Sequence, residues 1–374
     1  MAQQHLAVGL ISGTSADGID AVVIRTTGED RPELLSSMAT PYPEEIRQEI
    51  IGLYEPGENE IDRMGVLDRK LGHLFAKAAL AVIQKAGLTP KEISVIGSHG
   101  QTIRHRPPVF TLQIASPFAI AAETGITTVG DFRPADMMAG GDGAPLAPFL
   151  HSAVFGESGK NVGVLNLGGI ANLTALPGET HLPVTGGDTG PANTLLDHLA
   201  EVLSNGERCC DTNGESAAAG VVDESALAWL MDHDYFQHPF PKSTGREIFG
   251  QAYLKQFMKK FAHLPESTLF STLTQQTVES CATACDTLFN QPPHRLILCG
   301  GGAQNAEMLR RFQARLPTTK VVTSTECGVD ADSLEAQAFA WFAVRTRNGQ
   351  IATHPEVTGA SKATILGAVY PVLK

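Results

Sequence analysis

The residues best suited to chemistry form a glycine-rich stretch near the amino terminus, residues 12–20 (SGTSADGID). Small residues in succession expose backbone N–H groups, and the hydroxyls of Thr14 and Ser15 add donors, so the stretch can enclose a phosphate without steric obstruction. Asp17 and Asp20 would repel phosphate, but they can hold Mg²⁺ directly or through water. A turn closed by Asx hydrogen bonds uses the same residue types, so this stretch alone leaves two interpretations.

Two further glycine-rich turns occur later in the chain. LNLGGIAN carries Gly168 and Gly169 between two apolar runs, and CGGGAQN follows an apolar run with Gly300, Gly301 and Gly302. Such turns in both halves of the chain suggest a nucleotide that is held from two sides. Close packing of a strand against the following helix would also explain the last cluster.

Asp188, in VTGGDTGPANTLLD, is the candidate general base. Pro191 suits the first turn of a helix, which would place Asp188 at the end of a strand, just outside a helix amino terminus. A carboxylate in that position can accept a proton from a nucleophile. The competing interpretation is an acidic residue that is merely favoured by the helix dipole.

The elements that must position these residues alternate between strands and helices, which predicts an α/β fold. Residues 6–24 and 161–176 share one pattern, an apolar run, a polar glycine turn and a second apolar run, so each predicts a β-hairpin that opens a lobe. We expect lobes 1–157 and 158–374, divided within the polar interval 156–161. Helices are predicted at 61–86, 194–203 and 225–231, strands at 93–100 and 126–132, a loop at 133–148, and a strand, glycine turn and helix at 293–316.

Composition narrows the classes of partner. The chain has 374 residues and a formal net charge of -12, so two lobes are expected, and nucleic acids and anionic membranes are disfavoured as partners relative to a small molecule. No apolar run reaches the roughly 20 residues of a membrane span, and the first residues lack the pattern of a signal peptide. The six cysteines lack the spacing of a zinc site or a disulfide framework. We therefore expect a cytoplasmic protein with reduced thiols.

Taken together, the motifs resemble one family over essentially the whole chain. The motifs, in order, are GTSADGID, SHGQTIRH, DFRPADMMAGGDGAPLAP, NLGGIANLT, GGDTGPAN, PKSTGRE, CGGGAQN, DSLEAQAFAWFA and VTGA. The sequence is similar to anhydro-N-acetylmuramic acid kinases. This resemblance implies the two-lobed fold of actin, Hsp70 and the sugar kinases, with ribonuclease H-like lobes, mixed sheets flanked by helices, and ATP and substrate in the cleft.

The resemblance also assigns the nucleotide contacts. It implies ATP and Mg²⁺, with Asp17 and Asp20 toward the metal, and it implies a homodimer. The first-lobe phosphate loop would comprise Ser12, Gly13, Thr14, Ser15, Ala16, Asp17, Gly18 and Ile19. Gly168, Gly169 and Asn172 would approach the phosphates from the second lobe, and Gly300, Gly301, Gly302 and Asn305 would lie near the adenosine.

The family's reaction belongs to peptidoglycan recycling. It converts ATP, water and 1,6-anhydro-N-acetylmuramic acid to N-acetylmuramic acid 6-phosphate and ADP, with Asp188 activating the water that attacks the anomeric carbon. Cleavage of a glycosidic bond normally needs a second carboxyl group to protonate the leaving oxygen. Here the γ-phosphoryl group can accept that oxygen, so we expect no dedicated general acid for O6.

The resemblance places a group of polar side chains around the sugar. These are His99, Gln101, Thr102, Asp131, Arg133 and Glu335. The forked guanidinium of Arg133 suits the lactyl carboxylate. A core histidine is the alternative for His99, and a capping-box glutamate, three residues after Asp332, is the alternative for Glu335.

The PKSTGRE segment contributes Lys242, Ser243, Thr244 and Arg246, which the resemblance places at the border of the cleft; a solvated turn is the alternative. Three positions depart from the family's pattern. Gly187 stands where an aromatic residue is common, Ala192 replaces a usual glycine, and Asp142 stands where Gln is frequent. These departures concern fine sugar contacts.

Two rival functions remain open at this point. A plain sugar kinase would use Asp188 to deprotonate a sugar hydroxyl, and an actin-like or chaperone ATPase would turn over ATP without sugar. The carboxylates and guanidinium of GGDTGPAN and DFRPAD favour a small polar substrate over the second rival.

Overall fold

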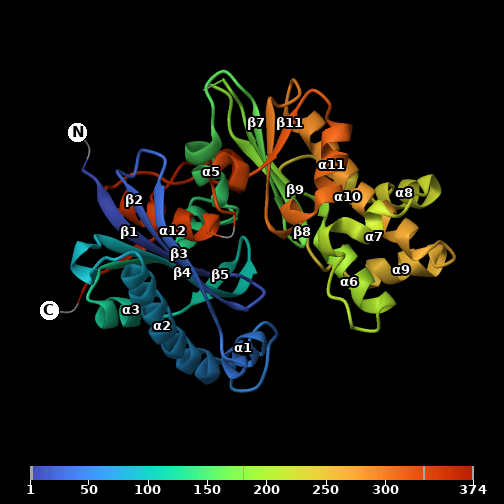
Figure 1. Cartoon of the computed structure of the whole chain (residues 1–374). Helices are drawn as coiled ribbons and strands as arrows, with labels where there is room; N and C mark the ends of the chain where they lie inside the picture. The colour runs from blue at the N-terminus through green and yellow to red at the C-terminus, as the bar shows by residue number, and fades with distance from the viewer. Residues whose placement is uncertain (1–2, 180, 332, 373–374) are drawn as a thin grey trace. The chain divides into compact units, whose positions relative to one another are not determined.

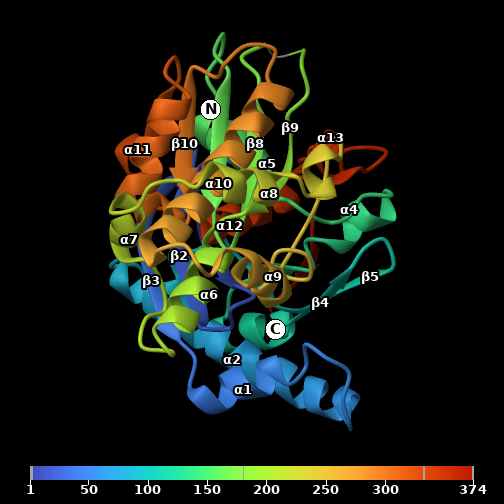
Figure 2. The ribbon, with the colours of Figure 1, turned by 90° about the vertical axis from the view of Figure 1, so that its right-hand side faces the viewer.

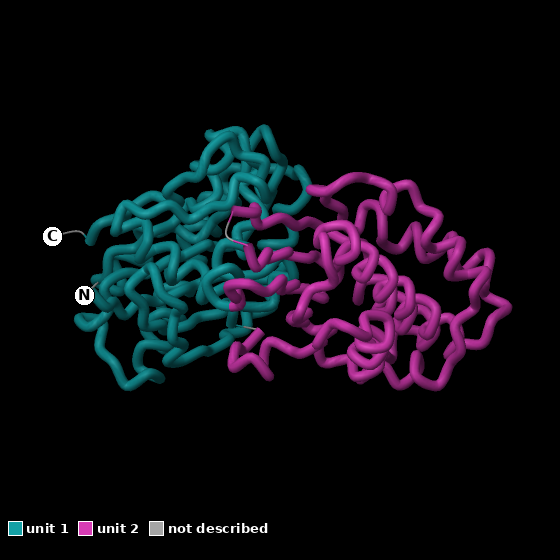
Figure 3. The backbone as a smooth tube through the Cα atoms, turned by 90° about the horizontal axis from the view of Figure 1, so that it is seen from above, with its two compact units in different colours: residues 1–154, 332–374 teal, residues 155–331 magenta. Residues whose placement is uncertain are grey.

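The computed structural model describes residues 3–179, 181–331 and 333–372, and the chain divides into two compact units (Figures 1 and 2). Unit 1 comprises Met1–Val154 and Asp332–Lys374, and unit 2 comprises Phe155–Ala331 (teal and magenta in Figure 3). The predicted boundary at 157/158 lies close to the first crossing point. The last segment of the chain belongs to unit 1, however, whereas the predicted second lobe extends to residue 374.

The sheet of unit 1 has the strand order β12-β6-β4-β1-β2-β3, with β5 paired to β4. β1 and β2 form the predicted hairpin, in which Ile11 lies opposite Asp20, and β1 runs parallel to β4. β4 runs parallel to β6 and is longer than predicted. The strands are β1 (His5–Ser12), β2 (Gly18–Thr26), β3 (Glu33–Pro41), β4 (Val95–Arg106), β5 (Phe110–Ile114), β6 (Thr128–Gly130) and β12 (Ala368–Tyr370).

Helices cover both faces of this sheet (Figure 1). α2 (Glu60–Lys85) carries the predicted apolar stripe, and its Leu67 and Phe75 share a buried cluster with Val8 and Leu10 of β1. Successive side chains of a strand point to opposite faces, so Gly9 faces the other side. There α12 (Leu334–Arg347) packs on β1, β2, β4 and β6. The smaller helices of unit 1 are α1 (Glu44–Ile51), α3 (Pro117–Thr124), α4 (Pro134–Met138), α5 (Ala147–Phe155) and α13 (Pro355–Thr358).

Two glycines allow α12 to approach the sheet directly. A Cβ on Gly9 would lie 1.9 Å from the Ala336 carbonyl oxygen, and one on Gly97 would lie 2.0 Å from the Phe339 carbonyl oxygen. Real atoms never come this close, so both positions require glycine for the helix to lie where it does. This contact explains why residues far apart in the sequence form one unit.

The sheet of unit 2 repeats the five-strand core β6-β4-β1-β2-β3 of unit 1, without counterparts of β5 and β12. It has the order β11-β10-β7-β8-β9, again with three consecutive antiparallel strands followed by two parallel ones. The strands are β7 (Val162–Leu167), β8 (Ile170–Leu176), β9 (Thr185–Pro191), β10 (Arg295–Cys299) and β11 (Lys320–Thr323). The predicted internal repeat and the α/β class are therefore confirmed.

The helices of unit 2 pack around a core that contains most of its aromatic residues. α10 contacts β8 and β9 and also α6, α7, α8 and α11 (Figure 2). The helices are α6 (Asn193–Leu203), α7 (Glu215–Ala218), α8 (Glu224–Met231), α9 (Gln251–Phe261), α10 (Glu266–Leu288) and α11 (Ala306–Arg315). The helices predicted at 61–86, 194–203 and 225–231 correspond to α2, α6 and α8.

Two local predictions are wrong. Residues 133–148 are not a simple loop, because they include α4 and the start of α5. Pro191 is the last residue of β9 and does not open a helix; α6 begins at Asn193. Pairing with β8 carries the strand through Pro191, and Asp188 consequently lies within β9 rather than beside a helix amino terminus. Among the described residues, no helix is both long and apolar enough to cross a membrane.

The contact between α12 and the sheet predicts a large effect of one methyl group. We expect Gly9→Ala to lower the free energy of unfolding by about 3 kcal/mol, because the new Cβ meets backbone atoms that cannot move independently. Gly65→Ala is the matched control, since a Cβ on this glycine of α2 meets nothing within 4 Å. Chemical denaturation measures both variants, and equal stability of the two would contradict the packing described.

Candidate functional site

In unit 1 the glycine-rich stretch is the connection between β1 and β2, and a buried glutamine of β4 fixes its start. Ser12 Oγ donates to Gln101 Oε1 at 2.6 Å, and Gln101 Nε2 donates to the Gly13 carbonyl at 3.0 Å. Both side chains are buried, whereas those of Thr14 and Ser15 are exposed. Gln101 therefore supports the loop from beneath, and its amide is occupied by protein partners.

The remaining residues of this loop fall into two groups. Ala16, in a left-handed conformation with φ 52°, and Ile19 are buried in the core of unit 1, so only their backbones can contribute to a ligand. The carboxylates of Asp17 and Asp20 both act on Tyr42, and burial together with these charges raises its pKa. The Tyr42 hydroxyl is buried. Both predicted metal-binding carboxylates are therefore close enough to act electrostatically on the same buried hydroxyl.

His99 and Arg133 form one connected group. Arg133 Nε donates to His99 Nε2 at 2.9 Å, and His99 Nδ1 lies 3.1 Å from the Gly100 carbonyl, which assigns the ring proton to Nδ1. Burial, followed by the charge of Arg133, holds the pKa of His99 well below its usual range, so the imidazole is neutral. The ring also packs on Phe339 of α12, with centroids 4.6 Å apart. Both ring nitrogens of His99 are therefore engaged within the protein, and the side chain that it contacts directly is Arg133.

Two other predicted sugar residues of unit 1, Asp131 and Thr102, have hydrogen-bond partners outside that pair. Asp131 has φ 52° and accepts a hydrogen bond from the Tyr370 hydroxyl. Thr102 Oγ1 accepts from Gln113 across the β4–β5 pair at 3.3 Å. Asp131 and Arg133 were predicted to line one pocket. Among the described residues, their side chains form no hydrogen bond or ion pair with each other.

Glu335 lies in the first turn of α12, with its side chain exposed. Surrounding protein raises its pKa, and the charge of Arg133 opposes that rise, so the two side chains interact electrostatically. The capping-box alternative relied on Asp332, which lies outside the described residues. Ser333 precedes the helix and its hydroxyl accepts from Gln337 at 3.0 Å rather than capping the helix.

In unit 2 three polar side chains form a row across adjacent strands. Asn166 of β7 lies opposite Asn172 of β8, and Asn172 lies opposite Asp188 of β9. Residues directly opposite on antiparallel strands point to the same face. Asn172 and Asp188 were predicted site residues, whereas Asn166 was missed, although it opens the NLGGIANLT motif.

One oxygen of the Asp188 carboxylate is held and the other is not. Thr244 donates its backbone N–H to Oδ2 at 2.9 Å, and Ser243 Oγ donates to the same oxygen at 3.1 Å. Oδ1 accepts no hydrogen bond from the described residues. Burial raises the pKa of Asp188, while these two donors oppose the rise and Glu247 adds to it. A carboxylate with a raised pKa and one unoccupied oxygen is suited to accept a proton.

The PKSTGRE segment is therefore more than a solvated turn, because it forms hydrogen bonds with both the backbone and the side chain of Asp188. Asp188 N–H donates to the Lys242 carbonyl at 2.8 Å, and the Tyr235 hydroxyl donates to the Asp188 carbonyl at 2.7 Å. Lys242 Nζ donates to the Tyr235 and Phe236 carbonyls. Arg246 has its guanidinium near Gly169.

Gly187 allows residues 240–242 to approach the backbone of β9 closely. A Cβ there would lie 2.7 Å from the Lys242 carbonyl oxygen and 3.0 Å from the Phe240 ring, and its φ of 155° also favours glycine. In this chain the space beside residue 187 is thus filled by residues 240–242. An aromatic side chain at residue 187 would have no room here.

The second and third glycine clusters of unit 2 lie against each other. Asn193 lies between them: its N–H donates to the Gly168 carbonyl and its Nδ2 donates to the Leu167 carbonyl at 2.9 Å, while its Oδ1 would lie 3.2 Å from a Cβ on Gly302. A Cβ on Gly300 would lie 2.4 Å from Asn166 Oδ1, and one on Gly302 would lie 2.7 Å from Leu167 Cβ. Close packing therefore accounts for Gly300 and Gly302, whereas Gly301 is exposed to solvent.

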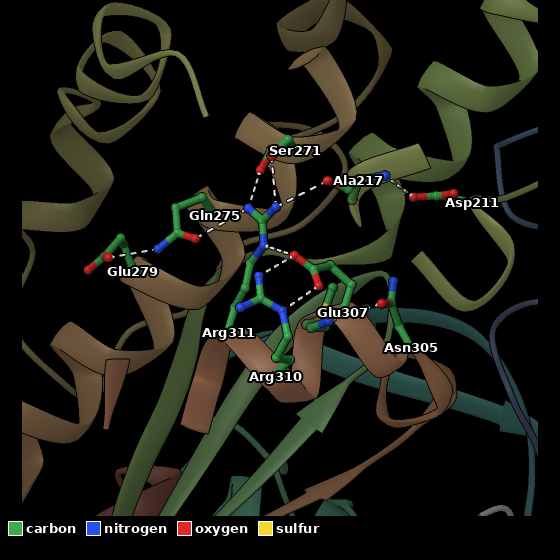
Figure 4. A network of polar contacts seen from close by, with 10 residues as sticks. Asp211, Ala217, Ser271, Gln275, Glu279, Asn305, Glu307, Arg310 and Arg311 are labelled. Atoms are coloured by element: carbon green, nitrogen blue, oxygen red, sulfur yellow. Dashed lines mark hydrogen bonds and ion pairs between the residues drawn. The ribbon is translucent and has the colours of Figure 1, made fainter. Parts of the chain in front are cut away.

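Asn305 caps α11, since its Oδ1 accepts from the Met308 N–H at 3.0 Å. The amide nitrogen of Asn305 is not used by this cap. A buried ion pair fixes the same helix (Figure 4): Arg311 Nε donates to Glu307 Oε1 at 2.6 Å and its terminal nitrogens donate to Ser271 and to the Ala217 carbonyl. The arginines hold the pKa of Glu307 at about 2, so the pair is charged.

The family model and the similar proteins that match this chain carry the same description, and they match it over nearly its full length. A family model described as anhydro-N-acetylmuramic acid kinase matches residues 5–372. A protein of that name from Shewanella amazonensis is 44% identical over 371 residues, which cover 98% of this chain and 99% of the relative. One from Shewanella halifaxensis is 46% identical over 367 residues, covering 97% and 98%. Among solved structures, a ROK family glucokinase from Streptomyces griseus, in complex with glucose and AMPPNP, covers 90% of this chain and 99% of its own, with 14% identity and a TM-score of 0.37.

The hydrogen bonds to Asp188 predict that its pKa changes when one of the donors is removed. We expect Ser243→Ala to raise the pKa of the Asp188 carboxyl, because the hydrogen bond from Ser243 favours the charged form. Carboxyl ¹³C titration of aspartate-labelled protein measures the value, with the resonance identified by its loss in Asp188→Asn. Ser225→Ala is the control, since Ser225 donates to Asp223 instead. An unchanged or lowered pKa in Ser243→Ala would show that this contact does not act on the base.

Proposed function

The chain belongs to the anhydro-N-acetylmuramic acid kinase family, and we propose that it opens 1,6-anhydro-N-acetylmuramic acid with water and phosphorylates O6 from ATP. The products are N-acetylmuramic acid 6-phosphate and ADP, and Asp188 is the general base. The geometry of Asp188 supports this assignment best. Its Oδ2 is held by two donors while Oδ1 is unoccupied among the described residues, as expected for a group that must receive a proton from water.

The mechanism requires only one acid–base residue. Asp188 orients a water and takes its proton as the oxygen attacks the anomeric carbon C1, and the bond from C1 to the bridging oxygen breaks. The bridging oxygen becomes O6 and bonds to the γ-phosphorus as the bond to ADP breaks, so no proton has to be delivered to it. The raised pKa of Asp188 improves its strength as a base at neutral pH.

Mg²⁺ would be held by Asp17 and Asp20, directly or through water. Their carboxylate oxygens suit this cation, and both carboxylates act electrostatically on the same buried Tyr42 hydroxyl. Mg²⁺ usually takes one or two protein carboxylates and completes its coordination with waters and substrate phosphates, so two aspartates suffice. When bound, it offsets the negative charge of the phosphates.

We assign the phosphates to the 12–20 loop and to the turn at Gly168 and Gly169, and the sugar to the group around Arg133. Arg133 uses Nε for His99 and Nη1 for the Gly143 carbonyl, so its Nη2 stays available for the lactyl carboxylate. Glu335, whose pKa is lowered by the charge of Arg133 against the rise that the surrounding protein causes, is assigned to a sugar hydroxyl. The family resemblance also supports a cytoplasmic homodimer, with a role in recycling of the cell wall.

Oxygen labelling distinguishes this reaction from that of a plain sugar kinase. With ¹⁸O water we expect label at C1 of the product in amounts that exceed anomeric exchange of added unlabelled product, as read by mass spectrometry of the quenched reaction. Label limited to that exchange would favour direct phosphorylation of a hydroxyl. ATP turnover that is equal with and without the anhydrosugar would favour an ATPase and reject both kinase assignments.

Loss of the base gives a second prediction. We expect Asp188→Asn to lower kcat about 10³-fold, because an amide cannot accept the proton, while KM for ATP changes less than about twofold. Asp286→Asn, at an exposed position on α10, is the control and retains full turnover. Steady-state kinetics with the anhydrosugar measures both, and near-normal kcat in Asp188→Asn would remove this residue from the catalytic role.

A further inference from the structure

A buried carboxylate in unit 1 has no role in the reaction described above. Asp136, in α4, is fully buried, and none of the described Lys, Arg or His side chains forms an ion pair with it. Its Oδ2 accepts the Gly143 N–H at 2.9 Å and its Oδ1 accepts the Thr358 hydroxyl at 2.8 Å. Burial of an unpaired charge is costly, so a position that served packing alone would be filled better by a neutral side chain.

The Gly143 peptide connects this carboxylate to Arg133. Its N–H donates to Asp136, and its carbonyl accepts Arg133 Nη1 at 2.8 Å. A carboxylate that binds the N–H of a peptide polarises the peptide and strengthens the hydrogen bond at its carbonyl. Asp136 therefore acts on the guanidinium without touching it.

The second contact of Arg133 completes the arrangement. Nε donates to the neutral His99, whose ring is itself fixed by the Gly100 carbonyl and by Phe339. Two contacts at different nitrogens define both the position and the plane of the guanidinium. Neither direct partner carries a negative charge, so the positive charge of Arg133 stays available to an anion.

Neutral contacts already attach the 133–143 segment to the end of α13 and to the residues that follow it. The Asp142 N–H donates to the Thr358 carbonyl at 2.8 Å, and Ser361 donates both its N–H and its hydroxyl to the Ala139 carbonyl at 2.8 and 2.7 Å. Attachment of the loop therefore does not depend on a charge at residue 136. Gly141 also accommodates that charge, because a Cβ there would lie 2.3 Å from Asp136 Oδ2.

We propose that Asp136 is a positioning residue that, through the Gly143 peptide, orients the Arg133 guanidinium for the substrate's carboxylate. The proposal rests on the function assigned to Arg133 above. It extends the sugar site to a residue that does not contact the sugar, and it makes recognition of the carboxylate depend on a buried charge.

A double-mutant cycle tests this dependence. Asp136→Asn keeps the shape, because its amide oxygen can accept the Gly143 N–H and its NH₂ can donate to the Thr358 hydroxyl. We expect Asp136→Asn and Arg133→Ala each to raise KM for the anhydrosugar about tenfold and to leave KM for ATP within twofold of wild type. In the Arg133→Ala background, Asp136→Asn should change the sugar KM less than twofold, because its effect runs through Arg133.

Two further variants separate positioning from general stability. Gly141→Ala displaces the carboxylate without removing it and should also raise the sugar KM, which gives a second route if Asp136→Asn fails to fold. Ser361→Ala removes a neutral contact between the same segments and should leave the sugar KM unchanged. Additive effects in the cycle, equal rises of both KM values, or a sugar KM raised as much by Ser361→Ala would overturn the proposal. An unchanged KM for the anhydrosugar in Arg133→Ala would also overturn it. The ¹⁸O labelling of C1 tests the proposed reaction independently of this residue.

Discussion

The close contact between α12 and the sheet of unit 1 determines most of what this unit can do. Gly9 and Gly97 lie on adjacent strands and leave the helix backbone directly against the sheet. The same helix carries Glu335 in its first turn and Phe339 against the His99 ring. His99 in turn contacts Arg133, so the placement of the guanidinium that we propose to bind the substrate depends on the absence of a side chain at these two glycines.

The two units share a topology but differ in the chemistry that they add to it. In unit 1, buried side chains hold exposed polar groups: Gln101 supports the glycine loop, and His99 and the Gly143 peptide hold Arg133. In unit 2, a segment between β9 and β10, residues 240–244, closes on Asp188 and leaves one carboxylate oxygen unoccupied among the described residues. Repetition of one strand order therefore supplies two similar frameworks, and the connecting segments make them different.

Sequence reasoning predicted the parts of the fold that depend on local pattern. The two hairpins and the helices α2, α6 and α8 follow from apolar periodicity and turn residues, which short segments encode. Pro191 misled the prediction because strand pairing outweighs the preference of proline for a first helical turn. The return of the last segment to unit 1 depends on contacts between Gly9 and Ala336, which no local pattern contains. Asn166 and Asp136 lay in motifs that had been identified, but only strand register and burial distinguish them from their neighbours.

Because unit 2 is inserted between the two segments of unit 1, the order of synthesis constrains the order of assembly. The first 154 residues emerge with one face of their sheet lacking its covering helix, and all of unit 2 is made before that helix appears. Since domains generally fold as units during synthesis, unit 2 can complete its core while unit 1 is still waiting. A ribosome that stops before residue 334 would release a chain whose inserted portion is whole and whose surrounding portion is open, a state that quality-control proteases and chaperones recognise by its uncovered apolar surface.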